Sequence, residues 1–162
     1  MLMPLFEWME RLAVYGASPY IGPAVNLVHL SSMVVFMGAL LVGDLRLLGV
    51  GRSLPVAQVA RDARPWLVGG LVGIVLTGIP QLAERATDQY VTSTFWVKMY
   101  LLAFALVWLF TVRRRALQVD EARGAWPKVV ALVSIVSFLG VAALARLIMM
   151  IPANAFEWLV GT

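Results

Sequence analysis

Residues 23–48 read PAVNLVHLSSMVVFMGALLVGDLRLL, a stretch in which apolar side chains dominate and acidic and basic ones stand only near its end. About 20 helical residues cross the roughly 30 Å hydrocarbon core of a bilayer, and this stretch is longer than that. Because lipid offers the backbone no hydrogen-bond partners, a spanning segment of this kind must be an α-helix. The stretch therefore predicts a transmembrane helix.

Three further stretches of the same kind follow, at 65–82, 94–112 and 127–151, and a short helix is expected at 53–64. Of the 162 residues, 61% are hydrophobic and 14% are charged, whereas about 25% are charged in ordinary soluble domains. A chain this short has too little interior to hide so much apolar surface from water. We predict an all-α protein, an integral membrane four-helix bundle that forms a single transmembrane domain over 1–162.

The segment before the first span has the pattern of an amphipathic helix rather than of a signal peptide. Its apolar residues recur at helical spacing, Glu7 and Arg11 stand four residues apart on the other face, and no basic region opens the chain. We expect a helix over about 2–15 that lies in the membrane interface, and a similar placement for residues 152–162.

Basic residues mark one side of the membrane. Nine of them lie in or beside the first and third connections between spans, whereas Arg11 and Arg85 lie on the other side. By the positive-inside rule those connections face the cytoplasm, which places both termini on the outer, periplasmic side. This distribution accounts for the net charge of +4 without nucleic acid as a partner. The nine are Arg46, Arg52, Arg61, Arg64, Arg113, Arg114, Arg115, Arg123 and Lys128.

The residues needed for most hydrolytic chemistry are absent from the sequence. The chain has no cysteine and one histidine, so zinc sites of the ordinary kind are excluded. It also has no phosphate-binding loop, nucleophile elbow or zinc-protease motif. We therefore expect the chain not to be an enzyme on its own.

Ionisable side chains inside membrane spans are costly and are therefore candidates for function. His29, Lys98 and Arg146 lie on three different spans, each within roughly 6–10 Å of the predicted outer boundary. Asn26, one turn before His29, is expected to share its network. The set predicts an outer-leaflet pocket for the propionates of haem b or for a quinone headgroup. Lys98 and Arg146 could instead reach the lipid headgroups, and Arg146 could pair with Glu84.

A second pattern on the first span suggests a copper site, a weaker prediction than the haem or quinone pocket. His29, Met33 and Met37 follow one another at steps of four residues and so lie along one stripe of the helix. Imidazole and thioether groups suit Cu(I), although methionine also fills gaps in apolar packing. With a single histidine, a haem held by two histidines of one chain is excluded.

Two further groups indicate structure rather than chemistry. Asp44 and Arg46 end the first span and are expected to face the basic run 113–115 in a charge cluster that fixes the topology. Gly69 and Gly73, followed by Thr77, form a stripe of small residues suited to close helix packing.

Several stretches carry a resemblance that covers nearly the whole chain. They are VHLSSMVVFMGALLVGDLRLLG (28–49), the segment 65–78, FWVKMYLLAFALVWLF (95–110) and the arginine late in the fourth span. They resemble an uncharacterised family of small four-helix bacterial inner-membrane proteins, which is distantly similar to copper-resistance D-type and b-type cytochrome membrane proteins. The resemblance implies a multi-pass protein of the bacterial inner membrane and no established activity. The positions it carries over are His29, Asp44, Arg46, Lys98 and Arg146.

These observations lead to one hypothesis and two alternatives. The hypothesis is a small, non-catalytic subunit or accessory protein of a redox-linked membrane complex, with a haem- or quinone-type pocket in the outer leaflet. Its expected partners are the lipid bilayer and either other membrane subunits or a second copy of itself. The alternatives are a copper or small-solute transport protein that uses the His29, Met33 and Met37 stripe, and a purely structural assembly partner.

Overall fold

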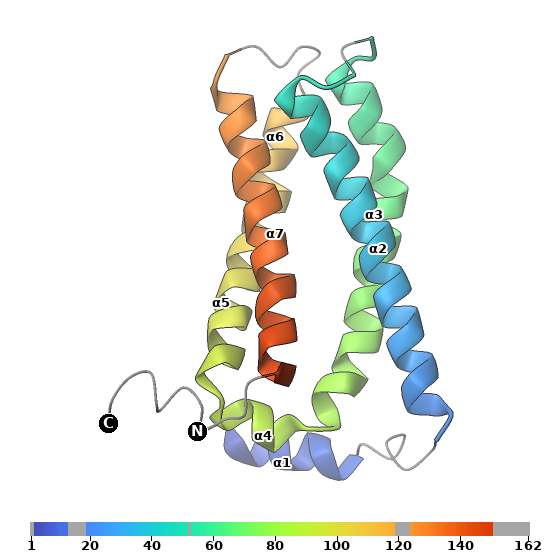
Figure 1. The fold of residues 1–162 in the computed structure, drawn as a ribbon, viewed down its shortest axis with the longest axis vertical. Coiled ribbons are helices and arrows are strands. Elements are labelled where there is room, and N and C mark those ends of the chain that lie inside the picture. Colours follow the sequence, from blue (N-terminus) through green and yellow to red (C-terminus); the bar gives the residue numbers. More distant parts are fainter. Residues whose placement is uncertain (1, 13–18, 52, 119–123, 151–162) are drawn as a thin grey trace.

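The structure is a computed structural model that describes residues 2–12, 19–51, 53–118 and 124–150, with the backbone alone at 12 and 148–150. The described residues form an all-helical bundle (Figure 1). Four of its helices are long and apolar enough to cross a membrane, which confirms the predicted helical class and number of long apolar segments. The expected interfacial placement of 152–162 lies outside the described residues.

The helices follow one another along the chain with short connections. The first is α1 (Met3–Leu12), which confirms the described part of the helix predicted over 2–15. The long helices are α2 (Ile21–Leu48), α3 (Val56–Ala83), a continuous helix from Ser93 to Ala116, and α7 (Trp126–Met150). The short α4 (Ala86–Val91) links α3 to the third long helix.

The third long helix changes its winding near one end. It consists of α5 (Ser93–Trp108), a π-helical turn η2 (Leu109–Arg113) and α6 (Arg114–Ala116). A π turn places one extra residue in the helix and rotates everything that follows it. The turn therefore decides which residue of the basic run 113–115 faces the bundle interior.

The helix α3 starts nine residues earlier than predicted. We expected a span beginning at Pro65 and a separate short helix over 53–64, but one helix runs from Val56 through Pro65 to Ala83. Proline lacks the N–H that would bond the carbonyl of Arg61, four residues earlier. Both residues are exposed, so this carbonyl lies near the polar end of the helix, where it can find other partners.

The four long helices form two pairs (Figure 1). The first pair is α2 with α3 and the second is α5 with α7, while α2 also contacts α7 and so joins the pairs. One buried cluster combines Phe36, Leu40, Leu67, Leu109 and Phe138, from all four long helices. A second cluster lies nearer to the α2–α3 connection. We call the end of the bundle with this connection and α6 the basic end, and the opposite end the α1–α4 end.

Buried residues between the pairs are confined to the half of the bundle next to the basic end. In the other half no described residue is buried at 21–35 of α2, 71–83 of α3, 96–104 of α5 or 139–147 of α7. Within each pair the helices still touch there, because Gly73 abuts Ser32 and Gly140 abuts Leu101. The two pairs therefore diverge toward the α1–α4 end (Figure 1). We call the region between them at 21–35, 71–83, 96–104 and 139–147 the open half.

The crossing of α2 and α3 depends on glycine at two positions. A Cβ atom at Gly70 would lie 2.7 Å from the backbone nitrogen of Phe36, and one at Gly73 would meet the hydroxyl of Ser32. The expectation for Gly69 has to be corrected, since it is exposed and a Cβ there would meet nothing within 4 Å. The facing stripe is therefore Gly70, Gly73 and Thr77, at spacings of three and four residues, which fits a helix that presents one face to its partner.

At the α1–α4 end, α1 packs on protein through aromatic side chains. The ring of Phe6 lies 5.0 Å from that of Tyr90 and 6.2 Å from that of Phe95, between centroids. The carboxylate of Glu10 accepts hydrogen bonds from the backbone N–H of Thr87, at 3.1 Å, and from its hydroxyl group. On the exposed side of α1 the apolar residues Leu5 and Trp8 lie beside the charged residues Glu7 and Arg11.

The contact between Glu10 and Thr87 makes the docking of α1 sensitive to acid. The side-chain and backbone hydrogen bonds from Thr87 hold the pKa of Glu10 below its usual value. The stabilisation is therefore fully present above about pH 4.3, the ordinary value for glutamate, and is lost as the pH falls through the lower pKa of the folded state. We expect the protection of the α1 amides against hydrogen exchange to fall, relative to that of the α7 amides, as the pH is lowered below about 4.3.

Glu10→Gln should give the faster exchange of α1 already at neutral pH. The matched control is Glu7→Gln, one turn earlier on the same helix, at an exposed position without a hydrogen bond to α4 among the described residues. Equal exchange rates in the two variants would show that Glu10 does not fasten α1.

Candidate functional site

A buried ion pair joins the two helix pairs in the half next to the basic end. Asp44 of α2 is completely buried, and its Oδ1 accepts a hydrogen bond of 2.6 Å from Nε of Arg113. Nη2 of the same arginine donates to the carbonyl of Leu40, at 2.9 Å. Ser134 of α7 is also fully buried and interacts with the Asp44 carboxylate, although outside the limits of a normal hydrogen bond.

Local features of the sequence make room for this ion pair. The π turn η2 ends at Arg113, and a Cβ at Gly43 would lie 2.7 Å from its Nη2. Arg46, expected beside Asp44 in the charge cluster, instead donates from Nε to the carbonyl of Leu54, at 2.7 Å, and so fastens the α2–α3 connection. Asp44 and Arg113 compensate each other's charge and join the two helix pairs, while Oδ2 of Asp44 and Oγ of Ser134 are buried without a hydrogen-bond partner among the described residues.

In the open half, the single histidine is held by a side chain of the neighbouring helix. Nδ1 of His29 lies 2.8 Å from Oγ1 of Thr77 on α3. The same Oγ1 lies 2.5 Å from the carbonyl oxygen of Gly73, one turn earlier on α3. The imidazole is half-buried and rests against Gly78, where a Cβ would lie 3.4 Å from its Cε1. Thr77 and the two glycines therefore fix the ring, while Nε2 has no hydrogen-bond partner among the described residues.

Lys98 brings a positive charge to the same region from the other helix pair. It is half-buried on α5 and close enough to His29 for the two groups to interact electrostatically. Its Nζ lies 5.2 Å from the ring centroid of Phe95, a cation–π distance. In the described part of the chain, no carboxylate lies within ion-pair distance of Lys98, since the one such pair there is Asp44–Arg113.

A third polar group in the open half also lacks a partner. The amide Nε2 of Gln81 is buried and makes no hydrogen bond within the described residues. Gln81 follows Thr77 by four residues and so lies one turn further along the same face of α3. Buried amide groups are almost always hydrogen-bonded, so the partner of Gln81 Nε2 lies outside the described residues.

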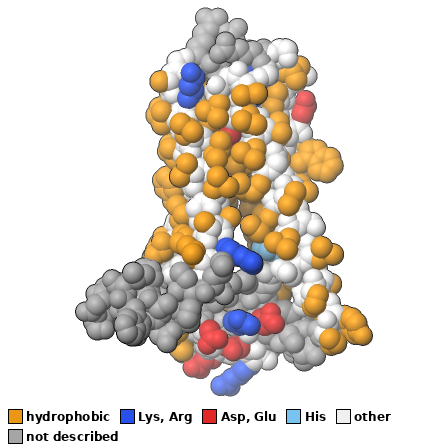
Figure 2. Space-filling view, in the orientation of Figure 1, with side chains coloured by type: hydrophobic (Ala, Val, Ile, Leu, Met, Phe, Trp, Pro, Cys, Tyr) orange, Lys and Arg blue, Asp and Glu red, His pale blue; other side chains and the backbone are white. Residues whose placement is uncertain are grey.

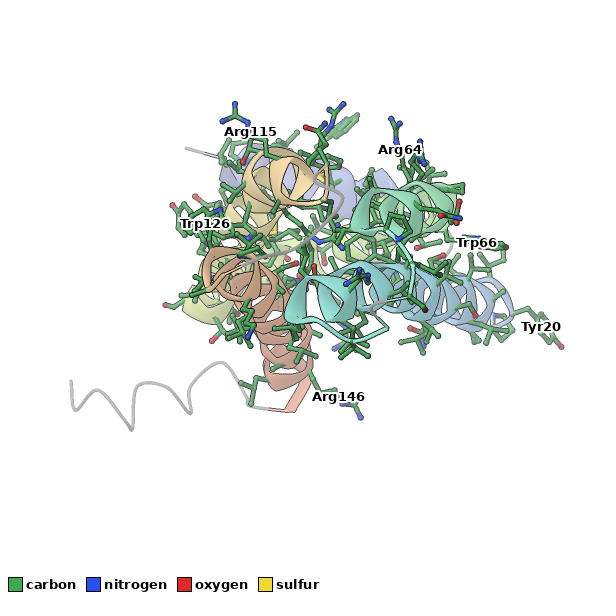
Figure 3. All side chains as sticks on the ribbon, turned by 90° about the horizontal axis from the view of Figure 1, so that it is seen from above. Tyr20, Arg64, Trp66, Arg115, Trp126 and Arg146 are labelled. Atoms are coloured by element: carbon green, nitrogen blue, oxygen red, sulfur yellow. The ribbon has the colours of Figure 1, made fainter. Side chains whose placement is uncertain are left out.

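The structure does not bring Asn26, Arg146 and Glu84 into this arrangement. Asn26 is exposed and takes no part in the hydrogen bonds of His29. Arg146 is exposed and projects from α7 away from the bundle (Figure 3). Glu84 is exposed and forms no ion pair among the described residues, which leaves its expected bond to Arg146 unmade. Figure 2 shows hydrophobic side chains over most of the length of this face of the bundle.

The methionine stripe is divided between two environments. Met37 packs against the buried cluster around Phe36 and Leu40, whereas Met33 is half-buried in the open half near His29. The described residues contain no group of three or more histidine, aspartate or glutamate side chains arranged to hold a metal ion. Met37 therefore has an ordinary packing role, and the copper site at His29, Met33 and Met37 stays a prediction.

Comparison with known families gives one match, which runs from residue 5 to residue 151. The chain belongs to DUF6644, a family of unknown function. No curated protein and no solved structure matches the chain. The expected membership of an uncharacterised family is therefore confirmed, while the DUF6644 match shows no similarity to copper-resistance D-type or b-type cytochrome membrane proteins.

Two residues of this DUF6644 chain acquire a role that the sequence had not suggested. The sequence predicts a packing stripe that includes Thr77, but Oγ1 of Thr77 lies 2.8 Å from Nδ1 of His29. Gln81 is a polar residue four positions after Thr77 and close to the end of an apolar span. Two polar residues four positions apart, at 77 and 81, indicate one polar face of the helix. The sequence alone does not show that this face lies against α2 and its histidine.

Proposed function

We propose that this chain is a multi-pass protein of the bacterial inner membrane that binds a quinone headgroup in its open half and serves as a non-catalytic, accessory subunit of a redox-linked membrane complex. The observation that carries the proposal is the proximity of His29 and Lys98, which are near enough to interact electrostatically. The two residues come from opposite helix pairs, and each presents a polar atom without a partner in the described part of the chain.

The chemistry of the open half suits a flat, mostly apolar molecule with oxygen atoms on its ring. The ammonium group of Lys98 can donate hydrogen bonds to a ring oxygen. The surrounding side chains are mainly aliphatic and half-buried, so they can cover the ring and the tail. Since the helix pairs diverge within the apolar part of the bundle, a quinone dissolved in the bilayer could enter sideways, without passing through water.

The distribution of charge supports the proposed orientation. The described basic residues near the basic end include Arg61, Arg64 and Arg115, of which Arg64 and Arg115 point outward in Figure 3. We place this end in the cytoplasm and the α1–α4 end, with both termini, on the outer side. The chain has no cysteine, so Ser53→Cys and Ser93→Cys would give single reactive sites at opposite ends. A membrane-impermeant maleimide added to intact cells should label the second and not the first.

Quinone binding can be tested on the purified full chain in lipid nanodiscs. We expect quinone to be extracted from the purified protein and a short-tail benzoquinone to quench its tryptophan fluorescence saturably. Lys98→Met should weaken binding by about tenfold or more, because a hydrogen bond to a charged group contributes roughly 1.5–3 kcal/mol. Asn26→Ala is the matched control, since Asn26 lies near His29 in sequence but outside its hydrogen bonds.

The same preparation distinguishes the other ligands considered. A Soret band in the absorption spectrum would show that the bound ligand is haem and not a quinone. His29 could then supply one axial ligand to the haem iron. If the protein shows neither quinone binding nor a Soret band, the proposed cofactor site is wrong. The hypothesis of a purely structural assembly partner would then be favoured.

A further inference from the structure

The position of one proton in the open half follows from a short distance. Oγ1 of Thr77 lies 2.5 Å from the carbonyl oxygen of Gly73. Two oxygen atoms this close repel each other unless a proton lies between them, and a carbonyl has no proton to give. The single hydroxyl proton of Thr77 is therefore committed to Gly73, in the back-bonding that threonine commonly makes to the preceding turn of a helix.

The bond to Thr77 then determines which nitrogen of His29 carries hydrogen. Since Oγ1 of Thr77 has no second proton, it can only accept from Nδ1 of His29, at 2.8 Å. A second cation beside Lys98 in apolar surroundings would be costly, so the imidazole is neutral. A neutral imidazole with hydrogen on Nδ1 presents a bare lone pair at Nε2.

From this lone pair we infer that the site prefers the reduced quinol over the oxidised quinone, an inference that rests on the proposed quinone site. A quinol hydroxyl can donate a hydrogen bond to Nε2 of His29. A quinone carbonyl has no proton to donate, so the lone pairs of its oxygen and of Nε2 would repel each other. Lys98 has the complementary property, because its ammonium group only donates and a hydroxyl oxygen can accept from it. Thr77 thus acts as a positioning residue that sets the redox preference of the site through His29.

The experiment compares the affinities of a short-tail benzoquinol and its benzoquinone, measured anaerobically on the full chain in nanodiscs. In the unmodified protein the quinol should bind about fivefold to tenfold more tightly, the effect of one net hydrogen bond. Thr77→Val keeps the shape of the side chain but removes the acceptor, so the ratio should fall toward one. Thr77→Ser keeps the hydroxyl group and should retain the ratio. His29→Phe removes the lone pair and should also bring the ratio to one.

Each outcome decides between the two proposals. A ratio that falls in Thr77→Val and is kept in Thr77→Ser supports the inference, because a purely structural role of Thr77 would weaken both ligands equally. Equal affinities in the unmodified protein, or tighter binding of the quinone, would overturn the preference and leave the quinone site standing. Failure of either form to bind would overturn both.

Discussion

Asp44→Ala is expected to lower the free energy of unfolding by about 3–5 kcal/mol, the usual cost of removing one partner from a buried ion pair. The substitution would leave the guanidinium group of Arg113 buried at 5% exposure, with the carbonyl of Leu40 as its remaining bond. Because Asp44 and Arg113 connect the two helix pairs, the loss would act on the joint between them. Thermal unfolding in detergent, followed by tryptophan fluorescence, measures the effect.

Two companion variants show whether charge is the cause. Asp62→Ala removes an exposed carboxylate of α3 and should change stability little. The double variant Asp44→Leu with Arg113→Met replaces the pair by apolar side chains and should recover most of the stability, since such replacements are often neutral or stabilising. A double variant as unstable as Asp44→Ala would mean that the hydrogen bonds and shape of this region matter, and not the uncompensated charge.

Gly70→Ala is expected to destabilise the protein by about 1–3 kcal/mol, the cost of adding atoms to a closely packed contact. The new Cβ would lie 2.7 Å from the backbone nitrogen of Phe36 and 2.9 Å from its Cα. Because backbone atoms cannot rotate away, α2 and α3 would have to separate. That separation should also lengthen the bond between His29 and Thr77, so ligand binding should weaken together with stability.

The neighbouring glycine provides the control for this prediction. Gly69→Ala meets no atom within 4 Å and should leave stability unchanged or slightly raised, since alanine is the better helix former. Equal effects of the two substitutions would contradict the close approach of α2 and α3 at Gly70.

The helical class and the number of long apolar helices could be predicted from the sequence. Hydropathy and length specify spanning helices almost by themselves, because lipid leaves the backbone no alternative. The side-chain contacts between helices could not be predicted in this way, because they depend on which helices become neighbours. Nothing in the run 113–115 says which arginine turns inward, because the π turn at 109–113 decides it.

The candidate site, too, could be predicted only in part from the sequence. The scarcity of ionisable residues within the spans led to His29, Lys98 and Arg146, and the structure unites only the first two. Depth in the membrane could be counted along each helix, but the direction in which a side chain points depends on the rotation of the helix about its axis. The bond to Thr77 also required the pairing of α2 with α3, which apolar patterning leaves undetermined.

The divergence of the two helix pairs has a consequence for the surrounding bilayer. Under the proposed insertion, a bundle that is joined at Asp44 and Arg113 and spread at its other end would occupy unequal cross-sectional areas in the two leaflets. Lateral pressure from the acyl chains would press the spread end together, and a molecule held there would resist that pressure. Under the proposed insertion, lipid composition and membrane curvature would therefore act on the occupancy of the open half, so the bilayer itself becomes one of the regulators of the site.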